Sequence, residues 1–141
     1  MSDSTASRLT GPPAPTVWPT VGFTHVDAGV RFLTEGLGFV VTAMYRSDDG
    51  VVEHAEARWP DGGGVIFSAR GRSGPWGDLG PQGVYVVAAD AATVDQAFAR
   101  VKDMPGVEVL HPLHDTDYGS HEFDLRDSDD NLWCVGTYRG V

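Results

Sequence analysis

The chain has 141 residues, of which 41% are hydrophobic, and its ten basic and twenty acidic residues give a formal charge of −10. A single domain of this length buries about 68% of the surface that its unfolded form exposes, and no stretch approaches the ~20 consecutive apolar residues of a membrane span. The acidity, with no cluster of Lys and Arg to offset it, excludes nucleic acid as a partner and attracts cationic small molecules, unless it serves only to keep the protein in solution.

The first sixteen residues are mostly Ser, Thr, Pro and Ala, with almost no large apolar side chain. Such a segment buries too little surface to offset the entropy of ordering, so we predict a disordered leader at 1–16 and a single domain at 17–141. The leader lacks the basic and apolar regions of an export signal. The only cysteine, Cys134, cannot form an internal disulfide. Both features indicate a soluble, cytoplasmic protein.

Two consecutive stretches show the same order of expected elements, strand, helix and three strands. In the first module, about residues 17–70, strands are expected at 17–23, 39–45, 51–59 and 65–69 and a helix at 27–37, with Gly38 as its C-terminal cap. A Gly- and Pro-rich linker follows at 71–83. In the second module, about residues 83–139, strands are expected at 84–88, 107–110, 121–126 and 132–138, a helix at 91–102 and a polar loop at 111–120. The repeat predicts an α+β domain of two βαβββ modules.

The chain also resembles a known superfamily. The residues that carry the resemblance are 19–39, 83–90 and 115–138, in which a Tyr-Gly loop is followed by the run DSDDNLW at 127–133. They are similar to the vicinal oxygen chelate superfamily, which includes glyoxalases, bleomycin resistance proteins and extradiol dioxygenases. The resemblance implies that both modules form a curved mixed sheet around a cavity and that two chains form a homodimer.

In the enzymes of this superfamily, a divalent metal is held by residues from the first and last strands of each module. The residues at those positions here are Trp18, Phe67, Val84 and Cys134, with Gly83 in place of Val84 if the register shifts by one. Of these, only Cys134 can ligate a metal, whereas such sites need several oxygen or imidazole donors. We therefore expect no metal and no other cofactor.

The alternation of side chains predicts what lines the cavity instead. In each module, the third strand places polar residues on one face and apolar residues on the other, and the apolar face is expected to pack on the helix. The polar residues are His54, Glu56, Arg58, Glu122, Asp124 and Arg126. They predict a polar wall above an apolar floor near Trp18, Phe67, Val84 and Leu132, which is the usual form of a small-molecule site. The alternative is that they form cross-strand ion pairs on a solvated face.

Three further residues have expected roles at this site. His54 is the candidate general base, because imidazole titrates near neutrality and Glu56 on the same face can orient it. Tyr118 is expected to cover the cleft, and Trp76 in the linker is expected to stack on an aromatic ligand. Either aromatic residue could instead fill a dimer interface. Trp133, which alternates with Cys134, is expected to lie in the core.

These features favour a metal-free binding protein that sequesters a small aromatic or cationic compound, as bleomycin resistance proteins do. The alternative is an enzyme of the lyase, isomerase or dioxygenase type. Such an enzyme would use a metal held by ligands other than those above, or His54 as a base. A third possibility is a dimeric module without a ligand.

Overall fold

The structure is a computed structural model that describes residues 12–141, so most of the predicted leader lies outside the described residues. The first module contains β1 (Thr20–Phe23), α2 (Val26–Arg31), the π-helical continuation η1 (Phe32–Leu37), β2 (Val40–Arg46), β3 (Val52–Arg58) and β4 (Gly64–Ala69). The second contains β5 (Gly83–Val87), α3 (Ala91–Val101), β6 (Glu108–Asp115), β7 (His121–Arg126) and β8 (Leu132–Gly136), and a short 3₁₀ turn, η2 (Pro75–Gly77), lies between them. The predicted α+β class and the duplicated βαβββ order are confirmed.

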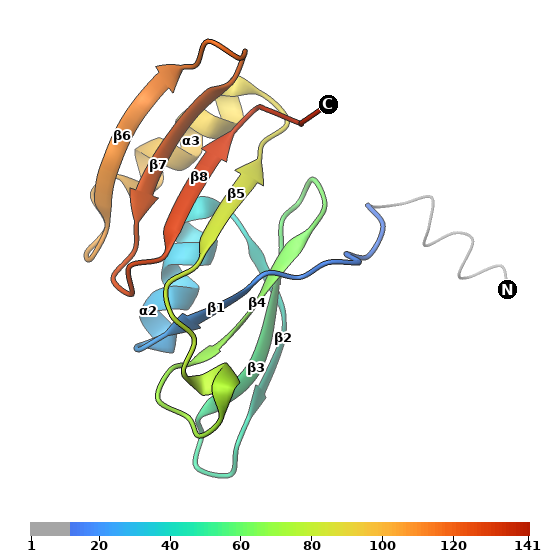
Figure 1. Cartoon of the computed structure of the whole chain (residues 1–141), viewed down its shortest axis with the longest axis vertical. Coiled ribbons are helices and arrows are strands. Elements are labelled where there is room, and N and C mark those ends of the chain that lie inside the picture. Colours follow the sequence, from blue (N-terminus) through green and yellow to red (C-terminus); the bar gives the residue numbers. More distant parts are fainter. Residues whose placement is uncertain (1–11) are drawn as a thin grey trace, which may run out of the picture.

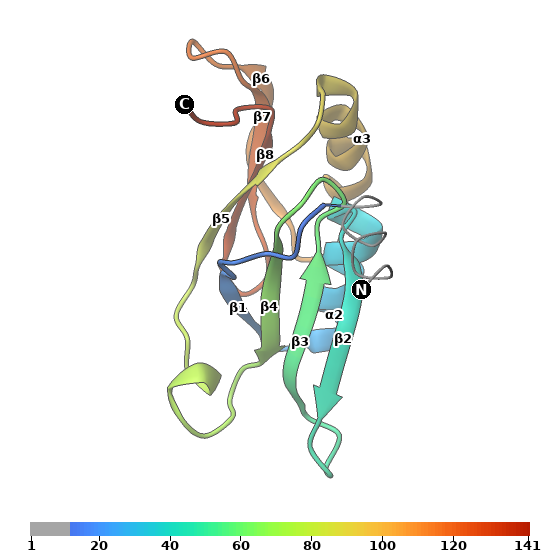
Figure 2. The same cartoon turned by 90° about the vertical axis from the view of Figure 1, so that its right-hand side faces the viewer.

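Each module forms its own four-stranded mixed sheet, with the strand orders β1-β4-β3-β2 and β5-β8-β7-β6. The first and last strands of each module are parallel neighbours, and the other neighbours are antiparallel. The two sheets lie one above the other along the long axis (Figure 1). Figure 2 shows α3 against one face of the second sheet, while its other face carries no helix. None of the helices between residues 12 and 141 is long and apolar enough to cross a membrane.

Two strands differ from the sequence-based expectation by three or more residues at one end. Strand β1 begins at Thr20 instead of residue 17, just after Pro19, which has no N–H to donate to a ladder. Strand β6 continues to Asp115, although residues 111–120 were expected to form a loop. Pro112 is tolerated there because β6 is an edge strand whose pairing with β7 shifts register on either side of His111. The expected cap at Gly38 is confirmed, since its φ of 107° is in the left-handed region.

The two modules share one hydrophobic core. Phe32 and Phe39 of the first module contact the Trp133 ring of the second, with ring centroids 5.6 and 6.2 Å apart. The Trp59 indole donates a hydrogen bond to the carbonyl of Val87 at 2.8 Å, again from one module to the other. Trp133 is fully buried, as expected. The modules are therefore held together by the residues that also pack each helix on its own sheet.

Residues 127–133 contain the turn between β7 and β8, and hydrogen bonds to the Asp127 side chain hold this turn in place. One Asp127 carboxylate oxygen accepts the backbone N–H groups of Asp129 and Asn131, and the other accepts the side-chain N–H groups of Asn131 and Trp133 at 3.1 and 2.9 Å. Asp127 and Asn131 are buried. The motif that carried the family resemblance is therefore a structural turn.

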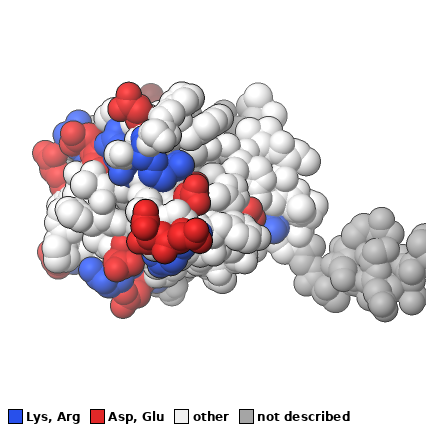
Figure 3. Space-filling model, turned by 90° about the horizontal axis from the view of Figure 1, so that it is seen from below, with Lys and Arg blue, Asp and Glu red and all other residues white. Residues whose placement is uncertain are grey.

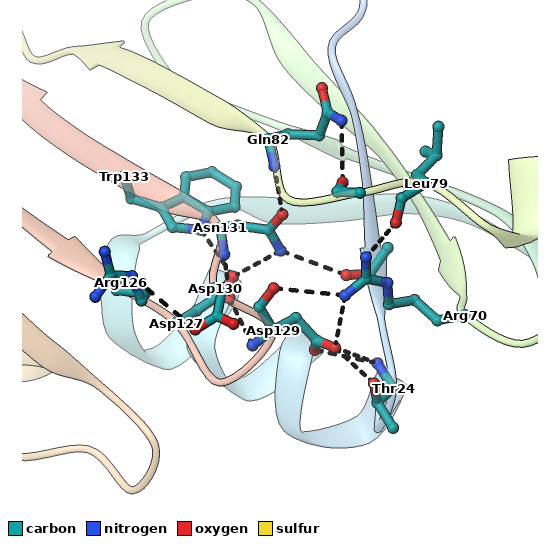
Figure 4. Close-up of polar contacts among 12 residues, drawn as sticks. Thr24, Arg70, Leu79, Gln82, Arg126, Asp127, Asp129, Asp130, Asn131 and Trp133 are labelled. Carbon is teal, nitrogen blue, oxygen red and sulfur yellow. Dashed lines mark hydrogen bonds and ion pairs between the residues drawn. The ribbon is translucent and has the colours of Figure 1, made fainter.

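The same turn joins the second module to the first (Figure 4). The Asp129 carboxylate accepts the Thr24 hydroxyl at 2.6 Å and the Thr24 backbone N–H at 3.1 Å, and it lies 3.4 Å from the Arg70 guanidinium. Asn131 accepts the backbone N–H of Gln82 at 2.9 Å. We call the contacts of Asp129 with Thr24 and Arg70 the module latch. It fixes the start of α2 and the end of β4 against the second sheet.

Candidate functional site

Each sheet has one face packed on the core and one face that we call its open face. The alternation predicted for β3 and β7 is confirmed, because Ala55, Ala57, Phe123 and Leu125 are fully buried in the core. The polar residues between them therefore lie on the open faces. Among the cavities of the described residues, one lies on each open face, and a third, of about 280 Å³, lies between the modules and is lined by residues of both, among them Trp59, Val65, Val84 and Val86.

The first open face carries a cavity of about 310 Å³, which we call the Trp76 pocket. Its lining residues are Thr20, Glu53, His54, Ile66, Ser68, Arg72 and Trp76. The linker between the modules brings Trp76 and Arg72 over the sheet, and Trp76 is 63% exposed although it belongs to the pocket wall. An exposed indole beside an aliphatic floor offers a stacking surface for a planar ligand.

His54 and Glu56 are in direct contact on this face, as their spacing predicted. The His54 Nε2 atom lies 2.7 Å from a Glu56 carboxylate oxygen, and both side chains are partly exposed. A carboxylate at this distance fixes the orientation of the imidazole. Arg58, predicted beside them, lies next to the N-terminal segment and donates to the carbonyl of Pro13 at 3.4 Å, outside the pocket.

The second open face centres on a buried carboxylate, Glu122. Its oxygens accept hydrogen bonds from the hydroxyls of Tyr118 and Ser120 at 2.8 Å each and of Tyr85 at 2.9 Å. Burial opposes the ionisation of Glu122, but these three donors outweigh it and hold the pKa of the carboxyl below its usual value. We call Glu122 and its three hydroxyl donors the Glu122 cluster. Gly136 makes room for it, because a Cβ at this position would lie 2.3 Å from the Tyr85 oxygen.

The charge on Glu122 acts on its neighbours. Burial, together with the hydrogen bond to Glu122, raises the pKa of Tyr85 to about 12. Burial and then the charges of Glu122 and Asp124 raise the pKa of the Cys134 thiol to about 12. Both groups are therefore protonated at neutral pH, and Cys134 is a poor nucleophile.

A second cavity of about 500 Å³ adjoins this cluster and is largely apolar. Tyr85, Leu110, His111, Asp124, Leu132 and Cys134 are among the residues that line it. Asp124 is paired with His111 Nδ1 at 2.9 Å, and Arg126 is paired with Glu108 on the neighbouring strand at 3.0 Å. Arg126 therefore forms a cross-strand ion pair on a solvated face, which was the alternative prediction for this residue.

Phe67 does not line either open face, contrary to expectation. Its side chain is fully buried in the core and packs edge-on against Phe23, with ring centroids 5.9 Å apart. Its neighbours Ile66 and Ser68 face the Trp76 pocket instead. The assignment was one residue out of register, because a run of apolar residues in β4 gives no alternation to follow. Trp18 is on the expected face, since a Cβ on Gly64 would lie 2.7 Å from its ring.

Val84 was expected beside Cys134, but Tyr85 is the residue aligned with it. The parallel pairing of β5 with β8 sets Tyr85 against Cys134 and Gly83 against Leu132. Gly83, the predicted alternative, therefore shares the open face with Cys134. The prediction of Val84 instead of Tyr85 was one residue out of register along β5.

The first and last strands of each module, where the family's enzymes hold a metal, carry an unsuitable set of donors in this chain. On the open faces they present Thr20 beside Ile66 and Ser68 in the first module, and Tyr85 beside Cys134 in the second. Hydroxyls, an aliphatic chain and a single thiol do not supply the carboxylate and imidazole donors that such metals require. Within residues 12–141, no three His, Cys, Asp or Glu side chains are grouped as a metal site. The residues present do not fit the metal.

Arg72 and Ser68 were not predicted as site residues. Arg72 lies in the linker, where there is no periodic pattern to assign a face, and donates to Ser68 Oγ at 3.0 Å. Ser68 follows the apolar run of β4 and is 3% exposed. Ser68 belongs to β4, and the linker brings Arg72 back over this strand into the Trp76 pocket. No local signal in the sequence specifies the path of the linker.

Comparisons with known proteins agree with the fold. The family model of the Glyoxalase/Bleomycin resistance protein/Dioxygenase superfamily matches residues 17–135. Among solved structures, TioX from Micromonospora sp. ML1 is 26% identical, with 85% of this chain and 97% of TioX covered and a TM-score of 0.63. Lactoylglutathione lyase from Agrobacterium tumefaciens is 20% identical, with 89% and 94% covered and a TM-score of 0.61. No curated protein matches the chain.

Proposed function

This chain belongs to the glyoxalase/bleomycin resistance protein/dioxygenase superfamily, and from that premise we propose that it is a metal-free protein that binds a small aromatic compound. The observation that carries the proposal is the Trp76 pocket. It combines an exposed indole, an aliphatic floor at Ile66 and a few convergent polar groups in about 310 Å³, which is within the size range of small-molecule sites. The poor donor set at the metal positions supports binding without metal chemistry.

A cationic ligand is also part of the proposal, and the second open face supports it. Glu122 and Asp124 lie beside a largely apolar cavity of about 500 Å³, in a chain with a formal charge of −10. Acidic groups beside apolar walls raise the local concentration of cations. The two pockets therefore favour different ligands, one through stacking and one through charge.

Binding is tested by thermal shift with a panel of aromatic compounds that includes cationic antibiotics. A ligand that binds only the folded chain raises the melting temperature by mass action. Trp76→Ala is expected to abolish the shift produced by stacking ligands. Tyr138→Ala is the matched control, because Tyr138 is 39% exposed and lies in the second module, outside the pocket. The absence of any shift across the panel would contradict the proposal, and so would stoichiometric nickel, zinc, manganese or iron in protein purified without chelators.

An enzyme that uses His54 as its base is the second candidate function. The 2.7 Å contact with Glu56 and the place of His54 in the wall of the Trp76 pocket favour it. A base must reach the substrate proton, and a carboxylate in contact with the imidazole fixes the orientation of its ring. His54→Ala would then abolish turnover without lowering the melting temperature, and Glu56→Gln would reduce turnover less. Turnover that survives His54→Ala would exclude this mechanism.

A homodimer is the remaining part of the proposal. Val40 and Leu132 are 56% and 44% exposed, and β1, β2, β5 and β6 are edge strands within the described chain. Exposed apolar side chains beside free sheet edges are suited to association. Light scattering coupled to size-exclusion chromatography measures the mass directly, and a mass of one chain at micromolar concentration would contradict the dimer.

A further inference from the structure

The guanidinium of Arg72 is held in a fixed orientation at the wall of the Trp76 pocket. Its Nε donates to the carbonyl of Ala69 at 3.1 Å, and one Nη donates to Ser68 Oγ at 3.0 Å. The two acceptors are neutral and belong to the end of β4, so the side chain is anchored without being neutralised. A guanidinium has five N–H donors, and these two bonds leave the others free.

No carboxylate within residues 12–141 lies within 4.0 Å of Arg72, although acidic residues outnumber basic ones two to one in the chain. Arg70 and Arg126, by contrast, are paired with Asp129 and Glu108. Figure 3 shows both acidic and basic side chains on the end of the molecule that contains the first module. Any selectivity of the pocket for charge therefore comes from its own groups.

Those groups favour an anion next to Arg72. The Glu56 carboxylate is in contact with His54 and makes no ion pair with Arg72. Glu53 also lines the pocket, but its side chain is exposed to solvent and makes no ion pair with Arg72. Ser68 accepts from Arg72 and keeps its own hydroxyl proton to donate. The fork of the guanidinium and this hydroxyl match the planar, acceptor-only geometry of a carboxylate.

We propose that the Trp76 pocket selects an aromatic carboxylate, with the ring against Trp76 and Ile66 and the carboxylate on Arg72 and Ser68. This inference rests on the proposed function, because it requires that the pocket bind an aromatic compound. It goes beyond that proposal by assigning the ligand a negative charge at a named residue. The ligand of this pocket then differs from the cation expected on the second open face.

The test compares 2-naphthoate with its neutral counterpart 2-naphthamide by isothermal titration calorimetry. The two probes share a ring system and shape, so the difference in affinity measures the charge. Charge-assisted hydrogen bonds are stronger than neutral ones, so we expect the wild-type chain to bind the carboxylate about tenfold more tightly. Arg72→Gln is expected to remove this preference, and Arg72→Lys to retain part of it because the charge stays and the fork is lost.

Arg46→Gln is the matched control, because it changes the net charge equally and Arg46 does not line the pocket. The preference of this variant for the carboxylate should remain within about twofold of wild type, because Arg46 is exposed and solvent screens its charge. Equal affinity of both probes for the wild-type chain, or equal effects of Arg72→Gln and Arg46→Gln, would overturn the inference. If both probes bind equally and Trp76→Ala weakens both, the aromatic pocket stands and only the charge assignment fails. If neither probe binds, the charge assignment fails, and the thermal-shift panel decides separately whether the pocket binds an aromatic compound.

Discussion

Replacing Asp129 by Ala removes the acceptor at the centre of the module latch, and we expect it to lower the free energy of unfolding by about 3 kcal/mol. The Asp129 side chain is buried and accepts two hydrogen bonds from Thr24, at 2.6 and 3.1 Å, beside Arg70 at 3.4 Å. A hydrogen bond to a charged group contributes about 1.5–3 kcal/mol, and the contacts of one side chain are not additive. Thr24→Val removes only the hydroxyl contact and should cost about 1–2 kcal/mol.

Urea denaturation followed by circular dichroism measures these changes, since a lower midpoint at constant slope reports lost stability. The melting temperature should fall by roughly 2–4 °C for each kcal/mol. Ser128→Ala is the control within the same turn, because Ser128 is exposed, and it should stay within about 0.5 kcal/mol of wild type. A loss below about 1 kcal/mol for Asp129→Ala, or no coupling between Asp129→Ala and Thr24→Val in a double-mutant cycle, would refute this account of the latch.

The other predictions concern titration and packing. Hydrogen bonds from His121 to Asp95 and then Asp115 raise the His121 pKa, so this contribution to stability is complete below about pH 6.5 and is lost as pH rises through the folded-state pKa. Asp95→Asn should therefore destabilise the chain more at pH 6 than at pH 9, and an equal loss at both would contradict this. With a pKa near 12, Cys134 should react with iodoacetamide at pH 8 much more slowly than free cysteine, and comparable rates would argue against it. Gly136→Ala brings a methyl group against Tyr85 and Glu122 and should lower the free energy of unfolding by about 1–3 kcal/mol, and an unchanged midpoint in urea would contradict this.

The sequence predicts the architecture well because binary patterns repeat in it. The alternation around His54 and Glu56 is regular, with small apolar residues between polar ones, and it placed both side chains on the correct face. The Gly38 cap and the buried Trp133 follow from equally local rules. Each of these features depends on residues within a few positions along the chain.

The errors occurred where local pattern carries no information. Val65, Ile66 and Phe67 are all apolar, so β4 reads equally well in either register and Phe67 was assigned to the wrong face. Arg72 reaches its pocket through the path of an irregular linker, which tertiary contacts decide. Tyr85 was missed by a count of one residue, although its hydroxyl is a main partner of Glu122.

The latch joins Thr24 to Asp129 across 105 positions of the chain, and the shared core likewise needs residues from both halves. Contacts this distant in sequence form only after the entropy of closing a long loop has been overcome, so we expect the chain to fold more slowly than a protein with mainly local contacts. Although the chain is built as a repeat, its halves are not independent units of stability. A fragment ending in the linker should remain unfolded, and the intact chain should unfold in one cooperative transition.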